Sequence, residues 1–206
     1  MKLMVLLVSA SSLLQPLWAG EARDQLDAFH LNMQTLQADF EQQLLSEKGE
    51  LQQQVSGRVY LQRPGMFRWD YSAPYEQMIM ADRRKLTIYD VDLEQVTIKA
   101  MDDALGQTPA VILSGDGELG ESFHIFELAP KGAMQRVELT PRNNEGSFVR
   151  MELGFLDGEL SVMTLQDTFG QNTIITLENV QRNKSLPKGI FEFEVPAGVD
   201  VVGDLD

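Results

Sequence analysis

The polar and apolar positions of residues 61–97 alternate with a period of two, the pattern that a pleated β-strand imposes. The alternation collects apolar side chains on one face of three successive runs. These are Phe67, Trp69 and Tyr71 in the first run, Leu86 and Ile88 in the second, and Val96, Ile98 and Ala100 in the third. Residues 81–84 and 90–93 are turn-like, so the runs are predicted to be antiparallel strands.

The same alternation extends over most of the chain, and Asp157-Gly158 is its strongest hairpin signal. Strands are predicted at 38–45, 51–62, 66–71, 76–80, 85–89, 94–101, 122–128, 134–140, 147–155, 159–167, 172–180 and 190–195. This much strand favours a mainly β fold with some α, in which an incomplete, unclosed antiparallel β-barrel carries helices at its mouth.

Two segments break the strand pattern and predict helices. Near the N-terminus, a helical stripe is formed by Ala22, Leu26, Phe29, Met33 and Leu36. The second segment is 108–114: Thr108 suits the N-cap, Pro109 the first helical position, and Gly115 the stop. Ala110 to Leu113 are all apolar, which predicts a short helix that is either buried or faces apolar material.

Residues 1–19 have the features of a secretory signal peptide, with a basic start, an apolar stretch and Ala19 before the expected cleavage site. A transmembrane anchor would need about 20 apolar residues, and polar residues interrupt this stretch early. The rest, 20–206, is predicted to form one domain located in the periplasm. With no cysteine in the sequence, a disulfide, a lipid-modified cysteine and a zinc–thiolate site are excluded.

The charge and the motifs argue against several function classes. A net charge of −14 disfavours nucleic acid as a partner. No nucleophile elbow, phosphate-binding loop or zinc motif is present, and His30 and His124 are expected to be structural, so an enzyme is not predicted. Asp90, Asp92 and Glu94 alternate like calcium ligands but lack the spacing and glycine of an EF-hand. No cofactor or metal is expected.

Residues 61–97 also carry separate motifs in a fixed order. They are the Arg-Pro pair at 63–64, Phe-x-Trp at 67–69, the segment 74–77, and Tyr-Asp-x-Asp-Leu-Glu-Gln-Val-Thr at 89–97. This combination resembles the periplasmic outer-membrane lipoprotein carrier family, LolA, and the resemblance continues to about residue 202. One departure is Asp82-Arg83, where many members have Asp-Gly.

The resemblance implies a carrier that takes triacylated lipoproteins from an inner-membrane ABC-type release complex to an outer-membrane receptor, as a monomer. The acyl chains would lie in an apolar cavity, for which we predict a lining of Phe67, Trp69, Tyr71, Met78, Met80, Leu86 and Ile88. It also implies that Arg63 bonds the backbone of a lid helix and holds the cavity shut. The lid residues would be Leu105, Pro109, Val111, Ile112 and Leu113.

Other interpretations remain at this point. From the pattern alone, the aromatic face is an ordinary packed core, Arg63 is a surface residue at a strand end, and the 108–114 helix is a plain cap. An envelope-sensing or regulatory module on the same fold would bind a partner protein instead of lipid. The receptor of similar fold needs a lipidated cysteine, an outer-membrane barrel would need aromatic girdles, and an acyl hydrolase would need a nucleophile and a base.

Overall fold

The computed structural model describes residues 20–100, 113, 119–143 and 148–203. Its elements are α1 (Glu21–Asn32), β1 (Thr35–Leu45), β2 (Leu51–Gln62), β3 (Met66–Ala73), β4 (Gln77–Asp82), β5 (Lys85–Asp90), β6 (Gln95–Ala100), α4 (Leu119–Ser122), β7 (Phe123–Lys131), β8 (Met134–Pro141), β9 (Phe148–Leu156), β10 (Glu159–Asp167), β11 (Asn172–Arg182) and β12 (Asp200–Gly203). The signal peptide predicted at 1–19 lies outside the described residues.

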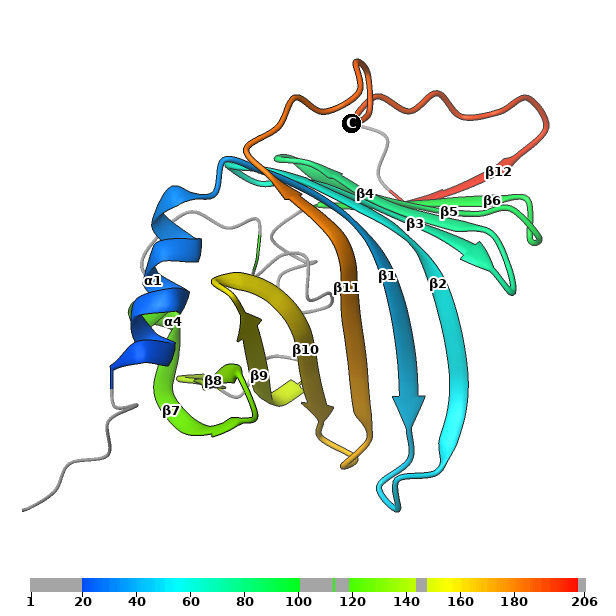
Figure 1. The fold of residues 1–206 in the computed structure, drawn as a ribbon. Helices are drawn as coiled ribbons and strands as arrows, with labels where there is room; N and C mark the ends of the chain where they lie inside the picture. Colours follow the sequence, from blue (N-terminus) through cyan, green and yellow to red (C-terminus); the bar gives the residue numbers. More distant parts are fainter. Residues whose placement is uncertain (1–19, 101–112, 114–118, 144–147, 204–206) are drawn as a thin grey trace, which may run out of the picture.

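All of these strands belong to one 12-stranded sheet in the order β12-β6-β5-β4-β3-β2-β1-β11-β10-β9-β8-β7. Neighbouring strands are antiparallel, except that β12 pairs with β6 in parallel. Because β7 and β12 are at the two ends of this order, the sheet is not closed. It curves so that its concave side faces α1 (Figure 1), which confirms the predicted unclosed barrel with an N-terminal helix.

The concave side of the sheet and α1 bury one apolar core. Ala22, Leu26 and Phe29 form the buried stripe of α1, as the helical spacing predicts. The ring of Phe29 meets the ring of Phe155 on β9 edge to face, with 5.8 Å between their centroids. The helix therefore holds the second half of the sheet in place across the concave side.

One side chain of β7 and one that directly follows β11 hold α1 at its two ends. The carboxylate of Glu127 on β7 accepts hydrogen bonds from the backbone N–H groups of Gly20 (2.7 Å) and Arg23 (2.8 Å), donors that a helix start leaves without partners. At the other end, Asn183 Nδ2 donates to the carbonyl of Asn32 at 2.8 Å. These contacts fix α1 relative to the sheet.

The hairpin predicted at Asp157-Gly158 joins β9 to β10, and both residues have positive φ, 52° and 79°. This is the backbone of a type I′ turn, which the Asp-Gly pair favours. At the departure from the family pattern, Arg83 has φ 78°. Arg83 N donates to Gly65 O at 3.1 Å, so the β4–β5 turn packs against the β2–β3 turn without the usual glycine.

The C-terminal segment differs from the prediction. No strand forms at 190–195, where the chain makes turns and an irregular path, and the prediction there is wrong. Instead, β12 pairs its short Asp200–Gly203 segment with β6. Phe193 of this segment packs its ring on Tyr89 of β5, although the backbone of 190–195 is not paired as a strand. Within the described ranges, no helix has both the length and the apolar character needed to span a membrane.

Candidate functional site

The concave face of β3 and β5 carries most of the predicted cavity lining. Phe67 is 0% exposed, Trp69 3% and Leu86 1%, and all three belong to the apolar core. Tyr71 and Ile88 are partly buried and pack against the same core. The ring of Phe40 on β1 lies between two of the β3 aromatics, 5.0 Å from Trp69 and 5.2 Å from Tyr71 between centroids.

Met78 and Met80 lie on the opposite face of the sheet. In the β3–β4 register they are opposite Asp70 and Arg68, whereas Ile79 is opposite Trp69. Side chains that face each other across a strand pair lie on the same side of the sheet. The prediction that the two methionines line the same surface as Phe67 is therefore wrong. Ile79, which packs against the core, takes their place.

The methionines belong to a second apolar layer on the outer side of β3 to β6, and the segment after β11 crosses this layer (Figure 1). Phe193 packs its ring on Tyr89, with 5.5 Å between centroids. Arg68 Nη1 donates to the carbonyl of Ile190 at 3.2 Å. Met78 and Met80, only 5% and 4% exposed, are thus buried away from the concave face.

Arg63 follows the last residue of β2 and reaches two different segments of the chain. Its Nε donates to the carbonyl of Leu113 at 3.0 Å. Its Nη1 donates to the carbonyl of His30 near the end of α1, and Nη2 lies 3.3 Å from His30 Nδ1. A guanidinium suits this position because its donors form a rigid fork and a helix end leaves carbonyls without partners. Arg63 therefore joins α1 to the segment that contains Leu113.

Of the predicted lid, the structure describes Leu113 alone. This residue is helical, 4% exposed and part of the apolar core with Phe67 and Trp69. The remaining predicted lid residues lie outside the described part of the chain: Leu105, Pro109, Val111 and Ile112.

A group of polar residues that was not predicted from the sequence lies on the same concave face, next to the aromatics of β3. Tyr71 donates its hydroxyl to Gln42 Oε1 on β1 at 3.4 Å. Gln53 Nε2 on β2 donates to the hydroxyl of Tyr75. Their position could be anticipated only from the register, since Gln42 alternates with Phe40 and Gln53 with Val55 on inward-facing positions.

Burial in this surrounding, together with the neighbouring Tyr75, raises the pKa of Tyr71 above the ordinary value of 10.0. The unfolded chain then loses this proton first as the pH rises, so the free energy of unfolding should fall above about pH 10, with a slope of at most about 1.4 kcal/mol per pH unit. Tyr71→Phe is expected to remove this part of the alkaline destabilisation. Urea unfolding from pH 8 to 11 measures it, and an unchanged slope in the variant would contradict the assignment.

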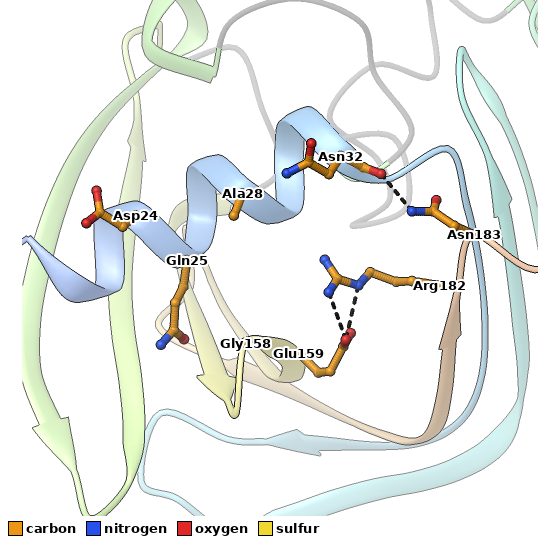
Figure 2. Close-up of a pocket in the computed structure, with 8 residues that line it drawn as sticks. All are labelled: Asp24, Gln25, Ala28, Asn32, Gly158, Glu159, Arg182 and Asn183. Atoms are coloured by element: carbon orange, nitrogen blue, oxygen red, sulfur yellow. Dashed lines mark hydrogen bonds and ion pairs between the residues drawn. The ribbon is translucent and has the colours of Figure 1, made fainter.

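A separate cavity of about 540 Å³ lies between α1 and the strands β10 and β11 (Figure 2). Six of its eight lining residues have polar or charged side chains, and the Arg182–Glu159 ion pair, 2.8 Å between Nη2 and Oε1, crosses one side of it. The lining residues are Asp24, Gln25, Ala28, Asn32, Gly158, Glu159, Arg182 and Asn183, none of which was predicted to line the acyl cavity.

The described residues contain no group of three or more His, Cys, Asp or Glu side chains that could hold a metal ion. In the predicted turn at Asp90 to Glu94, the Asp90 carboxylate stabilises the turn itself: its Oδ1 accepts a hydrogen bond from the backbone N–H of Leu93 at 3.0 Å.

Residues 31–194 match the model of the family described as outer membrane lipoprotein carrier protein LolA. The outer-membrane lipoprotein carrier protein of Nitrosospira multiformis is 42% identical over 180 residues, 87% of each chain. That of Methylococcus capsulatus is 43% identical over 182 residues, 88% of each chain. Among solved structures, an uncharacterized conserved protein from Thermus thermophilus has the same fold, with a TM-score of 0.54 and 14% identity over 88% of this chain and 96% of that one.

Proposed function

This chain belongs to the LolA family of outer-membrane lipoprotein carrier proteins, and we propose that it accepts triacylated lipoproteins from an inner-membrane ABC-type release complex and delivers them to an outer-membrane receptor. Exposing one 16-carbon acyl chain to water costs on the order of 12 kcal/mol, at about 0.8 kcal/mol per methylene. Lipoproteins therefore need an apolar container to cross the periplasm, and carrying them breaks no covalent bond.

The observation that carries this proposal is the position of Arg63. It bonds the carbonyl of His30 on α1 and the carbonyl of Leu113, and Leu113 belongs to the same apolar core as Phe67 and Trp69. We propose that Arg63 is a latch between α1 and a lid that contains Leu113, and that the described conformation is the closed, empty state. Lid opening would replace contacts of Phe67, Trp69 and Leu86 by contacts with acyl chains.

The fixed ends of α1 support different roles for α1 and for the segment that contains Leu113 in closing the concave face. Glu127 and Asn183 hold the helix to the sheet. Arg63 is the residue that bonds both α1 and the segment that contains Leu113. We infer that the segment containing Leu113 moves and that α1 stays. The loaded state must bind acyl chains better than the closed state does, because only such a difference in affinity shifts the equilibrium.

The proposal is tested by release of lipoprotein from spheroplasts. Spheroplasts with radiolabelled lipoprotein are incubated with the purified chain, and the medium is separated by size. We expect label in a soluble complex with one carrier per lipoprotein. Label that stays in the membrane, in the presence of a folded chain, would refute the carrier function.

A second candidate, a partner-binding regulatory module on the same fold, is favoured by one observation. Phe67 and Trp69 are buried at 0% and 3% exposure by the chain's own side chains, and a packed interior needs no ligand. The two functions differ in what copurifies from the periplasm. Acyl lipid or lipoprotein in the purified sample supports the carrier, whereas a lipid-free stoichiometric protein partner supports the module.

A further inference from the structure

The indole N–H of Trp69 suggests how the lipid anchor is positioned. Resting on the carrier function proposed above, we propose that this N–H donates a hydrogen bond to an acyl carbonyl oxygen of the cargo, the oxygen of the ester or amide that joins a fatty chain to the lipoprotein. Trp69 would then set the depth at which the hydrocarbon part of the anchor ends.

The first observation is that Trp69 Nε1 has no hydrogen-bond partner in the described part of the chain, although the residue is only 3% exposed. Three other buried side-chain atoms there share this condition, but all three are oxygen acceptors of residues that are themselves partly exposed. An indole nitrogen can only donate. A buried donor without a partner destabilises the folded chain, a cost that phenylalanine at this position would avoid.

The surroundings of Trp69 identify the kind of partner that fits. Across the sheet it faces Val59 on one side and Ile79 on the other, and the Phe40 ring packs against it. No charged group is among these neighbours. A neutral acceptor attached to hydrocarbon suits this place, and an acyl carbonyl is such a group.

The order of residues along β3 supports the same partner. Phe67 is apolar and fully buried, Trp69 is apolar with one donor, and Tyr71 bonds Gln42 in the polar group described above. An acyl ester has the same order: hydrocarbon, then a carbonyl, then a polar glyceryl unit. The concave face changes from apolar to polar at Trp69, where the proposed bond places the carbonyl.

One hydrogen bond also suits a carrier that must release its cargo. An acyl carbonyl taken into a dry interior has lost its bonds to water, and the empty protein keeps a donor without a partner, so loading satisfies both groups at once. A single neutral bond changes affinity by a modest factor, which guides the cargo without trapping it.

The test compares two probes, 1,2-dioctanoylglycerol, which has two ester carbonyls, and 1,2-dioctylglycerol, the ether without carbonyls. Affinities are measured by isothermal titration calorimetry with the whole purified chain. We expect the ester to bind about three- to tenfold more tightly, the factor that one neutral hydrogen bond supplies. Benzothienylalanine at position 69 replaces the N–H by sulfur in a ring of the same shape, and it should bind both probes equally.

Each result separates this inference from the carrier function. Equal binding of ester and ether by the unaltered chain overturns the inference and leaves the carrier function standing, whereas binding of neither probe overturns both. The role of Trp69 is overturned if the chain with benzothienylalanine at position 69 still prefers the ester, or if Tyr71→Phe loses this preference instead. In either case another group donates the hydrogen bond to the carbonyl. A matching thermal unfolding midpoint shows that the isostere is folded.

The fluorescence of Trp69 gives a second measurement in the same chain. The sequence has two tryptophans, Trp18 and Trp69, and Trp18 lies in the predicted signal peptide, so a chain that starts after Ala19 has Trp69 as its single emitter. Hydrogen bonding of the indole N–H should move the emission to longer wavelength with the ester than with the ether. Identical emission maxima in the two complexes would overturn the proposed bond.

Discussion

A chain carrying Arg63→Leu is expected to take up lipoprotein from spheroplasts normally but to deliver about a tenth or less of the wild-type amount to outer membranes in the same time. Arg63 donates to the carbonyls of His30 and Leu113, and hydrogen bonds from a charged donor contribute about 1.5–3 kcal/mol each. In the proposed cycle these bonds form when the empty carrier closes, so closing helps to drive the cargo out. Since 1.4 kcal/mol is a factor of ten in an equilibrium constant, losing them should leave cargo on the carrier.

Arg58→Leu is the matched control for this variant. Arg58 is an exposed arginine of β2 that pairs with Asp39 at 2.8 Å on the outside of the sheet, and its loss should leave delivery unchanged. The measurement is the fraction of labelled lipoprotein that moves from the soluble complex to outer membranes. Wild-type delivery by Arg63→Leu, or an equal defect in Arg58→Leu, would remove the latch from the proposal.

The strand pattern could be predicted from the sequence, but the facing of neighbouring strands could not. A period of two shows that Phe67 and Trp69 share one face and that Met78 and Met80 share one face. It does not show whether these faces are the same. The β3–β4 register decides this and pairs Ile79 with Trp69. Because a shift of one residue exchanges the two faces, the methionines were placed on the wrong side.

The C-terminal segment shows a second limit. Phe191 and Phe193 alternate as in a strand, but no strand forms there, and Phe193 packs its ring on Tyr89 of the apolar outer layer. Periodicity records which side chains are buried and not whether the backbone is paired. The outer layer exists only once β3 to β6 have assembled. The local sequence therefore does not show that residues 190–195 cover this layer.

The Arg63 contacts were anticipated only through the family resemblance. The partners of Arg63 lie 33 and 50 residues away in the chain, and no local pattern connects an arginine at a strand end to them. The buried donor of Trp69 is similar, because the alternation predicts that the ring is inside but not that its N–H lacks a partner. Local spacing shows which side chains of one strand share a face, whereas the relative facing of two strands and the polar contacts depend on the assembled fold.

Gly57→Ala is expected to lower the free energy of unfolding by about 3 kcal/mol or more, the upper end for added volume in a packed site. A Cβ on Gly57 would lie 1.8 Å from the backbone oxygen of Asp70 and 3.0 Å from Cε1 of Phe40. The Asp70 oxygen belongs to the neighbouring strand β3 and cannot rotate away as a side chain could. The strands β2 and β3 must separate here, next to the Phe40, Trp69 and Tyr71 rings.

Thermal unfolding measures this effect, with an expected decrease of about 6–12 °C in Tm, since 1 kcal/mol corresponds to about 2–4 °C in a chain of this size. Gly120→Ala is the control, because a Cβ on Gly120 has no neighbour within 4 Å, and its Tm should change by less than about 2 °C. If Gly57→Ala unfolds at the wild-type temperature, β2 and β3 can separate at little cost. Acyl chains could then reach the aromatic face by separation of β2 and β3, and movement of the segment that contains Leu113 would not be needed.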